Sequence, residues 1–470
     1  MRFLFVFFLF SISRFSFSNT TITGTAPEFK NKTLFVRTYS DLITYNLIAV
    51  ASDTIDDSGN FSFTVNNTQP LPIFINIDDY ESQFYIESNK NYIILYEPIP
   101  DAEITPFWKK KSGKITIQNT DSSDLNQNLS QFYESYDNFM LKNYTLFLSK
   151  RAKPSIDSFN IQVNETFKSY HNFYFQNTTT YTTATMYLAN NESKKKIYEK
   201  YIDSKPVLYH HVTYMDFINQ FYNQFFNSIS FKNRTDLINS IKTEKSFSDC
   251  LKILAREPFL KNERIRELVL LIGLYDMYNN PQYSKQNTLF IIKEIAIKSE
   301  QKEHQEIAKN MVFNLTKMTT GHPAPDFHLP NQKRDVISLD SILKKKKYVY
   351  LNFWATWCTS CIKEMELIHK LKNQYNDFIE FVSISLDKET TKPNSYLKEN
   401  QQYNWTFLDG QNSFSLIDDY NIKAVPTYFL IDSDGILLES PALKPSENIE
   451  SVFKKIQPKS TDPKFILREK

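Results

Sequence analysis

The chain has 470 residues, a length that predicts about three domains rather than one continuous core. Its hydrophobic content of 41% and charged content of 23% are ordinary for a globular protein. A net charge of +2 gives no electrostatic case for nucleic-acid binding. The three cysteines are too few for a disulfide framework in a chain of this size.

The first 18 residues have the pattern of a secretory signal. Arg2 supplies the positive charge, Phe3 to Phe10 is an unbroken apolar run, and serine-rich sequence follows to Ser18. The alternative is an uncleaved membrane anchor, but the apolar run is shorter than the roughly 20 residues that span a bilayer. We therefore predict a cleaved signal, export to the periplasm or cell envelope, and no integral membrane span.

Residues 19–105 are predicted to form a small all-β domain, an antiparallel sandwich. Short stretches rich in β-forming residues are separated by turn residues such as Asp56 to Asn60. The predicted strands cover residues 34–39, 61–65, 71–77 and 92–96. No catalytic cluster is found there, so we interpret this domain as a binding or spacer module.

Residues 106–317 are predicted to be all-helical, because apolar residues recur at three- and four-residue steps. Ser122 or Ser123 is available as an N-cap for the first helix. Apolar residues spaced three or four apart, from Leu125 to Met140, form one face of that helix. Further helical spacing covers residues 198–202, 215–225, 265–278 and 289–297. The histidines of this region lack metal-ligand spacing and are interpreted as structural or surface residues: His171, His210, His211 and His304.

Cys250 is the one cysteine without a neighbour of its kind. It stands in the helical pattern of Phe247 to Leu254. We predict a buried small hydrophobic residue there; the alternative is a reactive thiol.

Residues 318–458 alternate strand and helix patterns, which predicts an α/β domain, and residues 459–470 are predicted to be a flexible tail. Strands are expected at 348–355, 378–386, 427–431 and 436–439, with helices at 358–375 and 394–400. A closing helix is predicted from Ser446 to Ile456, with Ser446 as its N-cap.

The pair Cys358 and Cys361 stands where the first of these strands passes into a helix. Free N–H groups and the positive end of the helix dipole lower the pKa of a cysteine at such a position, and only the thiolate attacks disulfides. Zinc sites use the same spacing but need four ligands, and no further ligand pair lies nearby. A buried structural pair is the remaining alternative.

Residues 318–458 resemble the thioredoxin fold, and specifically the TlpA/ResA-like extracytoplasmic thiol–disulfide oxidoreductases. Three stretches carry the resemblance: residues 321–327 (GHPAPDF), 352–361 (NFWATWCTSC) and 424–427 (AVPT). The whole chain is also similar in arrangement to multidomain members from Bacteroidetes-type bacteria, with a β-rich first domain and a helical middle.

The resemblance implies a role for each site residue. Cys358 is expected to be the exposed nucleophile and Cys361 the buried resolving thiol. Pro426 matches the family's cis-proline loop, and the substrate is expected to bind along Val425, Pro426 and Thr427, beside Trp357. No cofactor and no metal are implied.

One position departs from ordinary thioredoxins. Asn352 stands where an acidic proton acceptor is common, and an amide cannot shuttle protons. The ResA-like branch instead has a Glu one helical turn after the second Cys, a place that Glu364 occupies. We expect Glu364 to tune the thiol pKa and to accept the proton. The alternative is a solvated surface Glu.

The resemblance also implies partners: disulfide-containing envelope proteins as substrates and a membrane thiol donor of the DsbD or CcdA type. Two other functions stay open. A peroxiredoxin-like peroxidase shares the lead-in from Ala324 to Phe327, but the proline that precedes the peroxidatic cysteine in that group is missing here. Alternatively, residues 19–317 bind a partner or glycan and the redox domain is accessory.

Overall fold

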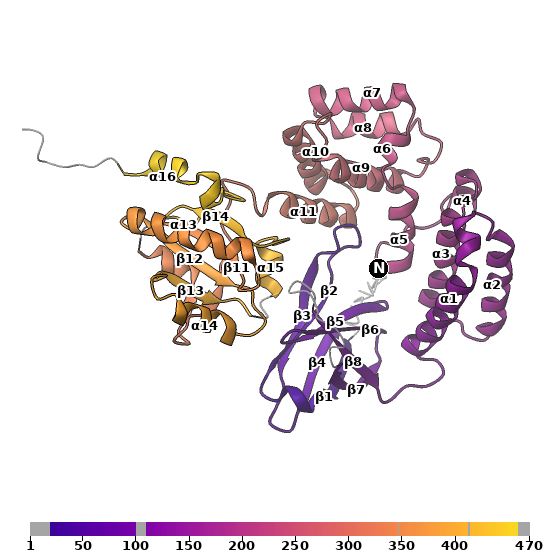
Figure 1. Ribbon diagram of the computed structural model, residues 1–470. Coiled ribbons are helices and arrows are strands. Elements are labelled where there is room, and N and C mark those ends of the chain that lie inside the picture. Colours follow the sequence, from indigo (N-terminus) through magenta and orange to yellow (C-terminus); the bar gives the residue numbers. More distant parts are fainter. Residues whose placement is uncertain (1–18, 100–109, 346, 412–413, 459–470) are drawn as a thin grey trace, which may run out of the picture. The chain divides into compact units, whose positions relative to one another are not determined.

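A computed structural model describes residues 19–99, 110–345, 347–411 and 414–458 of the chain. The predicted signal (1–18), the predicted tail (459–470) and the predicted border at residues 105–106 lie outside these described residues. The described chain forms two compact units: residues 19–99 with 112–307, and residues 110–111 with 308–458 (Figure 1).

The strands of the first unit form an eight-stranded sheet within the described residues, in the order β3-β2-β5-β6-β8-β7-β1-β4. Alternating residues of its strands face one shared core, as in a sandwich. The strands are β1 (Asn19–Thr25), β2 (Thr33–Tyr39), β3 (Leu47–Thr54), β4 (Asn60–Asn66), β5 (Leu71–Ile77), β6 (Tyr80–Ile86), β7 (Asn91–Pro98) and β8 (Lys111–Ile117), with a 3-10 turn η1 (Pro27–Phe29).

The strand-rich first region is therefore confirmed, with two differences. A fully antiparallel sandwich was expected, but β1 pairs with β7 in parallel. Strands β1, β3, β6 and β8 were not among the predicted strands. β8 lies in the region predicted to be helical, and its residues alternate between partly buried and exposed, so it lacks the buried side chains that mark β2 and β4.

The helical middle region is also present, and Figure 1 shows its helices following the sheet along the chain. Buried apolar and aromatic side chains fill the spaces between neighbouring helices. The helices are α1 (Leu125–Leu148), α2 (Lys153–Thr166), α3 (Phe173–Ala189), α4 (Lys194–Tyr201), α5 (Val212–Phe221), α6 (Phe225–Ser228), α7 (Phe231–Asn239), η2 (Ser240–Glu244), α8 (Phe247–Leu254), α9 (Glu263–Met277), α10 (Lys285–Lys298) and α11 (Lys302–Thr316).

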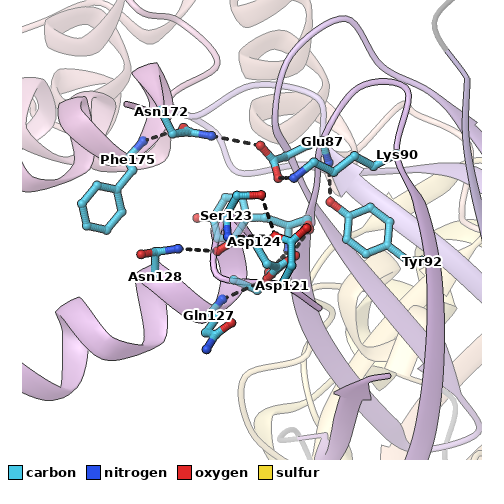
Figure 2. Close-up of polar contacts among 12 residues, drawn as sticks. Glu87, Lys90, Tyr92, Asp121, Ser123, Asp124, Gln127, Asn128, Asn172 and Phe175 are labelled. Carbon is cyan, nitrogen blue, oxygen red and sulfur yellow. Dashed lines mark hydrogen bonds and ion pairs between the residues drawn. The ribbon is translucent and has the colours of Figure 1, made fainter. Parts of the chain in front are cut away.

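Asparagine side chains join the sheet to the helices inside this unit. Asn172 caps α3 by accepting a hydrogen bond from the N–H of Phe175 (3.1 Å) and donates to the carboxylate of Glu87 at the end of β6 (2.9 Å; Figure 2). The N-cap of α1 is Asp124, which accepts from the N–H of Gln127 (3.0 Å), and not Ser122 or Ser123 as expected.

The second unit contains a five-stranded sheet in the described residues, in the order β13-β12-β11-β14-β15. Helices cover both faces. The elements are β9 (His328–Pro330), β10 (Val336–Ser338), α12 (Leu339–Leu343), β11 (Tyr348–Trp354), α13 (Thr359–Tyr375), β12 (Ile379–Ser385), α14 (Thr391–Glu399), β13 (Thr406–Asp409), α15 (Phe414–Asp419), β14 (Thr427–Ile431), β15 (Leu437–Glu439), η3 (Pro445–Glu447) and α16 (Glu450–Ile456).

Strand β11 lies at the centre of this sheet and is buried on both faces. Val349, Leu351 and Phe353 pack into one core with α12 and α15, while Tyr350 and Trp354 pack into a second core with α13, α14 and α16. β11 is parallel to β12, so the carboxyl ends of the two strands meet at one edge of the sheet. That edge carries the cysteine pair.

Candidate active site

The cysteine pair lies at the start of α13. Cys358 is the N-cap of the helix, and Cys361 stands in its first turn. The two sulfur atoms form a disulfide, with the Cα atoms 5.2 Å apart. Cys358 is 7% exposed and Cys361 1%, so Cys358 is the more accessible sulfur but less open than the expected exposed nucleophile.

The helix start directs polar groups at the sulfur of Cys358. The N–H of Cys361 donates to Cys358 Sγ over 3.1 Å, and Ser360 Oγ lies 3.3 Å from the same sulfur. These groups and the helix dipole stabilise negative charge on Cys358 Sγ once the disulfide is reduced.

The loop before β14 closes over this sulfur. The bond between Val425 and Pro426 is cis, and the carbonyl oxygen of Val425 lies 3.6 Å from Cys358 Sγ. Val425 and Pro426 are partly buried, and Thr427 begins β14 beside Phe353 of β11. Trp357 is 56% exposed directly before the nucleophile position. The fold thus brings Cys358, Cys361 and the Pro426 loop together, with Trp357 on the accessible surface.

Glu364 is a buried residue, with 7% exposure, and not the solvated surface Glu of the alternative interpretation. Its carboxylate accepts hydrogen bonds from the N–H of Ser446 (3.1 Å) and from the Ser446 hydroxyl. Burial raises the pKa of Tyr428, and the negative charge of Glu364 raises it further. The phenol oxygen of Tyr428 is buried without a hydrogen-bond partner in the described part of the chain.

Asn352 is 2% exposed and takes part in a short chain of neutral groups. Its side-chain oxygen accepts from Ser383 Oγ (2.5 Å), which in turn accepts from the indole N–H of Trp405 (2.8 Å). None of these three groups exchanges a proton readily near neutral pH. Asn352 thus offers no proton acceptor, and the first carboxylate after Cys361 on α13 belongs to Glu364.

Sequence reasoning assigned Ser446 a different place. It was expected to cap a helix from 446 to 456, but α16 begins at Glu450 and Ser446 lies in the short turn η3. The hydroxyl that was expected to cap the helix instead donates a hydrogen bond to Glu364, 82 positions away in the sequence. No local pattern reports such a contact.

A second missed residue is Asp387, which follows β12 and is 2% exposed. Its carboxylate accepts from the N–H and the hydroxyl of Thr356, in the loop that leads to Cys358. A signal was available: polar residues directly after two parallel neighbouring strands lie at the same sheet edge.

Of the four histidines of the first unit, His171 and His210 are exposed, while His211 and His304 have structural roles. His211 caps α5, stacks on Tyr174 and is 4% exposed; burial lowers its pKa to about 4. His304 is fully buried between Tyr209 and Glu267. In the described residues no group of three or more His, Cys, Asp or Glu side chains could hold a metal ion.

Comparisons with known proteins bear on this second unit. A model of the thioredoxin-like family matches residues 346–437. The thiol-disulfide oxidoreductase ResA of Bacillus anthracis is 32% identical over 145 residues, which are 30% of this chain and 81% of ResA. The chain belongs to the thioredoxin-like thiol–disulfide oxidoreductases of the ResA type. The match lies in the C-terminal domain, and that domain is a thiol–disulfide oxidoreductase.

Two further similarities concern the same part of the chain. The thioredoxin-like protein YneN of Bacillus subtilis is 32% identical over 117 residues, covering 25% of this chain and 68% of YneN. The crystal structure of a putative thiol-disulfide oxidoreductase from Bacteroides vulgatus has 29% identity and a TM-score of 0.28, and the match covers 30% of this chain and 99% of that one. No helix in the described residues is long and apolar enough to cross a membrane.

Proposed function

We propose that this protein is an exported oxidoreductase that reduces disulfides of envelope proteins through a cycle of Cys358 and Cys361. The observation that carries the proposal is the position of Cys358. Its sulfur caps α13 and accepts a hydrogen bond from the N–H of Cys361. It also lies 3.6 Å from the carbonyl oxygen of Val425 in the cis-proline loop. A nucleophile with a stabilised thiolate thus stands beside a backbone segment that can receive an extended substrate chain.

The cycle transfers two electrons to the substrate. The Cys358 thiolate attacks one sulfur of the substrate disulfide, forming a mixed disulfide and releasing the other substrate sulfur as a thiolate. Cys361 loses its proton and attacks Cys358 Sγ, which releases the second substrate thiolate and leaves the Cys358–Cys361 disulfide. A dithiol donor then reduces this disulfide; in an oxidising compartment we assign that role to a membrane thiol donor of the DsbD or CcdA type.

Glu364 is the proposed acceptor of the Cys361 proton. It lies one helical turn after Cys361 on α13, and its burial places a carboxylate inside the domain. A base held inside the protein can take the proton where bulk water has little access.

Trp357 and the residues from Val425 to Thr427 form the proposed substrate surface. Trp357 contributes an exposed aromatic side chain, while the loop contributes backbone groups next to the reacting sulfur. Residues 1–18 form the proposed secretory signal, which directs the protein to the periplasm or cell envelope.

Trapping of the mixed disulfide tests the proposal. In Cys361→Ser the second step is blocked, so the full-length variant should accumulate covalent complexes that reductant releases. Cys250→Ser should behave as the unmodified protein, and Cys358→Ser should trap nothing. Trapping through Cys361 in Cys358→Ser, or turnover of peroxide without a disulfide substrate, would contradict the proposal. Identification of the trapped proteins distinguishes an apocytochrome from a cell-wall enzyme.

A further inference from the structure

Asp387 is a buried carboxylate at the sheet edge that carries the active site. It follows β12, separated from its last residue by Leu386, and only 2% of its surface is exposed. Each donor that contacts its side chain is a neutral group: the N–H of Thr356 (2.9 Å), the hydroxyl of Thr356 (2.6 Å) and the hydroxyl of Ser385 (2.8 Å). A carboxylate is an acceptor only, and three donors satisfy it without a cation.

These contacts hold the loop that leads from β11 to α13. Thr356 stands two residues before Cys358, and Asp387 binds both its backbone and its side chain. One residue earlier on the β12 side, the N–H of Leu386 donates to the carbonyl oxygen of Trp354 (2.8 Å). The loop is therefore tied to the end of β12 at both Trp354 and Thr356, directly before the nucleophile.

The charge of Asp387 acts on the same region. Only Trp357 separates Thr356 from Cys358, so the Cα atoms of these two residues lie at most ~8 Å apart. Asp387 is thus bound close to the residue that carries the sulfur. No ion pair of Asp387 with a Lys, Arg or His is present in the described residues. Two charged groups lie in this region, Asp409 and Arg334. Burial raises the pKa of Asp409, the positive charge of Arg334 lowers it, and the charge of Asp387 raises it. A negative charge here opposes the stabilisation that the start of α13 gives to a thiolate.

We propose that Asp387 is a positioning residue of the redox site: it fixes the loop that carries Cys358, and its charge limits thiolate stabilisation at Cys358. This inference rests on the proposed role of Cys358 as the nucleophile. A less stabilised thiolate corresponds to a dithiol that gives up its electrons more readily. Asp387 thus favours the reducing direction. It supplies a negative charge from the end of β12, while Asn352, at the position where ordinary thioredoxins often have an acidic residue, is neutral.

The test uses the full-length protein and separates position from charge. Asp387→Asn keeps the shape and one acceptor but removes the charge, so the pKa of Cys358 should fall by roughly half a unit to one unit. The reduction potential, measured against glutathione buffers, should become more oxidising. The exposed Asp377→Asn is the matched control and should change neither value.

Thr356 variants test the positioning role and remain informative if Asp387→Asn does not fold. Thr356→Val removes the hydroxyl donor but leaves the charge, so disulfide exchange should slow several-fold without a fall in the Cys358 pKa; Thr356→Ser should restore the rate. An unchanged pKa and potential in folded Asp387→Asn, or an unchanged rate in Thr356→Val, would overturn the inference. Failure of the proposed function itself would give a different result: disulfide exchange would persist in Cys358→Ser, which lacks the proposed nucleophile.

Discussion

At the scale of single residues, the environment of Glu364 determines what its removal should do. Glu364→Gln keeps the shape and acceptor oxygen but cannot take a proton from Cys361. We expect disulfide exchange near neutral pH to slow by roughly tenfold or more, with a weaker loss at high pH, where hydroxide can remove the proton instead. Stopped-flow exchange with a model disulfide from pH 5 to 10 measures this effect.

Ser446 provides the matched comparison for Glu364. Ser446→Ala removes one of the two donors that hold the carboxylate and should reproduce part of the Glu364→Gln effect. Ser395 is exposed on α14, so Ser395→Ala should leave the exchange rate unchanged. An identical pH profile in Glu364→Gln and the unmodified protein would show that another group accepts the proton.

Cys250 is the opposite kind of cysteine. It is fully buried in α8, which confirms the prediction of a buried small hydrophobic residue. Burial raises the pKa of its thiol to about 11, so below pH 11 it is mainly the unreactive thiol. We expect no alkylation of the oxidised native protein at pH 8 and one alkylated site in denaturant, where the thiol titrates near 8.5. Mass spectrometry counts the labels; rapid native labelling at Cys250 would contradict this account.

At the scale of elements, one helical contact reverses an ordinary rule. Gly273 lies in α9, and a Cβ added to it would stand 2.3 Å from the ring of Phe226. Gly→Ala within a helix usually stabilises by about 1 kcal/mol, but overpacking costs about 1–3 kcal/mol. We therefore expect Gly273→Ala to lower the free energy of unfolding, as measured in urea.

A double-mutant cycle isolates the cause of that loss. In the background of Phe226→Leu, where the ring is gone, Gly273→Ala should be neutral or stabilising. An equal loss in both backgrounds would mean that the contact with Phe226 is not responsible.

The same scale shows what sequence could and could not predict. The strand from Tyr348 and the helix that ends at Tyr375 were predicted closely because buried runs and caps are local signals. The contact of Glu364 with Ser446 was not predicted, since it joins segments that only tertiary packing brings together. The contact of Asp387 with Thr356 was missed, although both residues follow neighbouring parallel strands. Strand β8 was missed for the related reason that it presents few buried side chains.

At the scale of the whole molecule, the two units have separate hydrophobic cores. The sheet of the first unit encloses its own core, while β11 to β15 are covered on both faces by helices of the second unit. The relatives that identify the second unit match only about a third of this chain, so they carry no information on the sheet and helices of the first unit. The role of residues 19–317 has to be tested directly.

A fragment of residues 318–470 makes that test. Because the redox domain contains its own core and every proposed site residue, the fragment should unfold cooperatively and reduce a small-molecule disulfide at a rate within about twofold of the full chain. Its rate on the trapped envelope substrate should fall if the first unit recognises that substrate. Equal rates on this substrate would argue against recognition, and loss of small-molecule exchange in a folded fragment would show that the site depends on residues before 318.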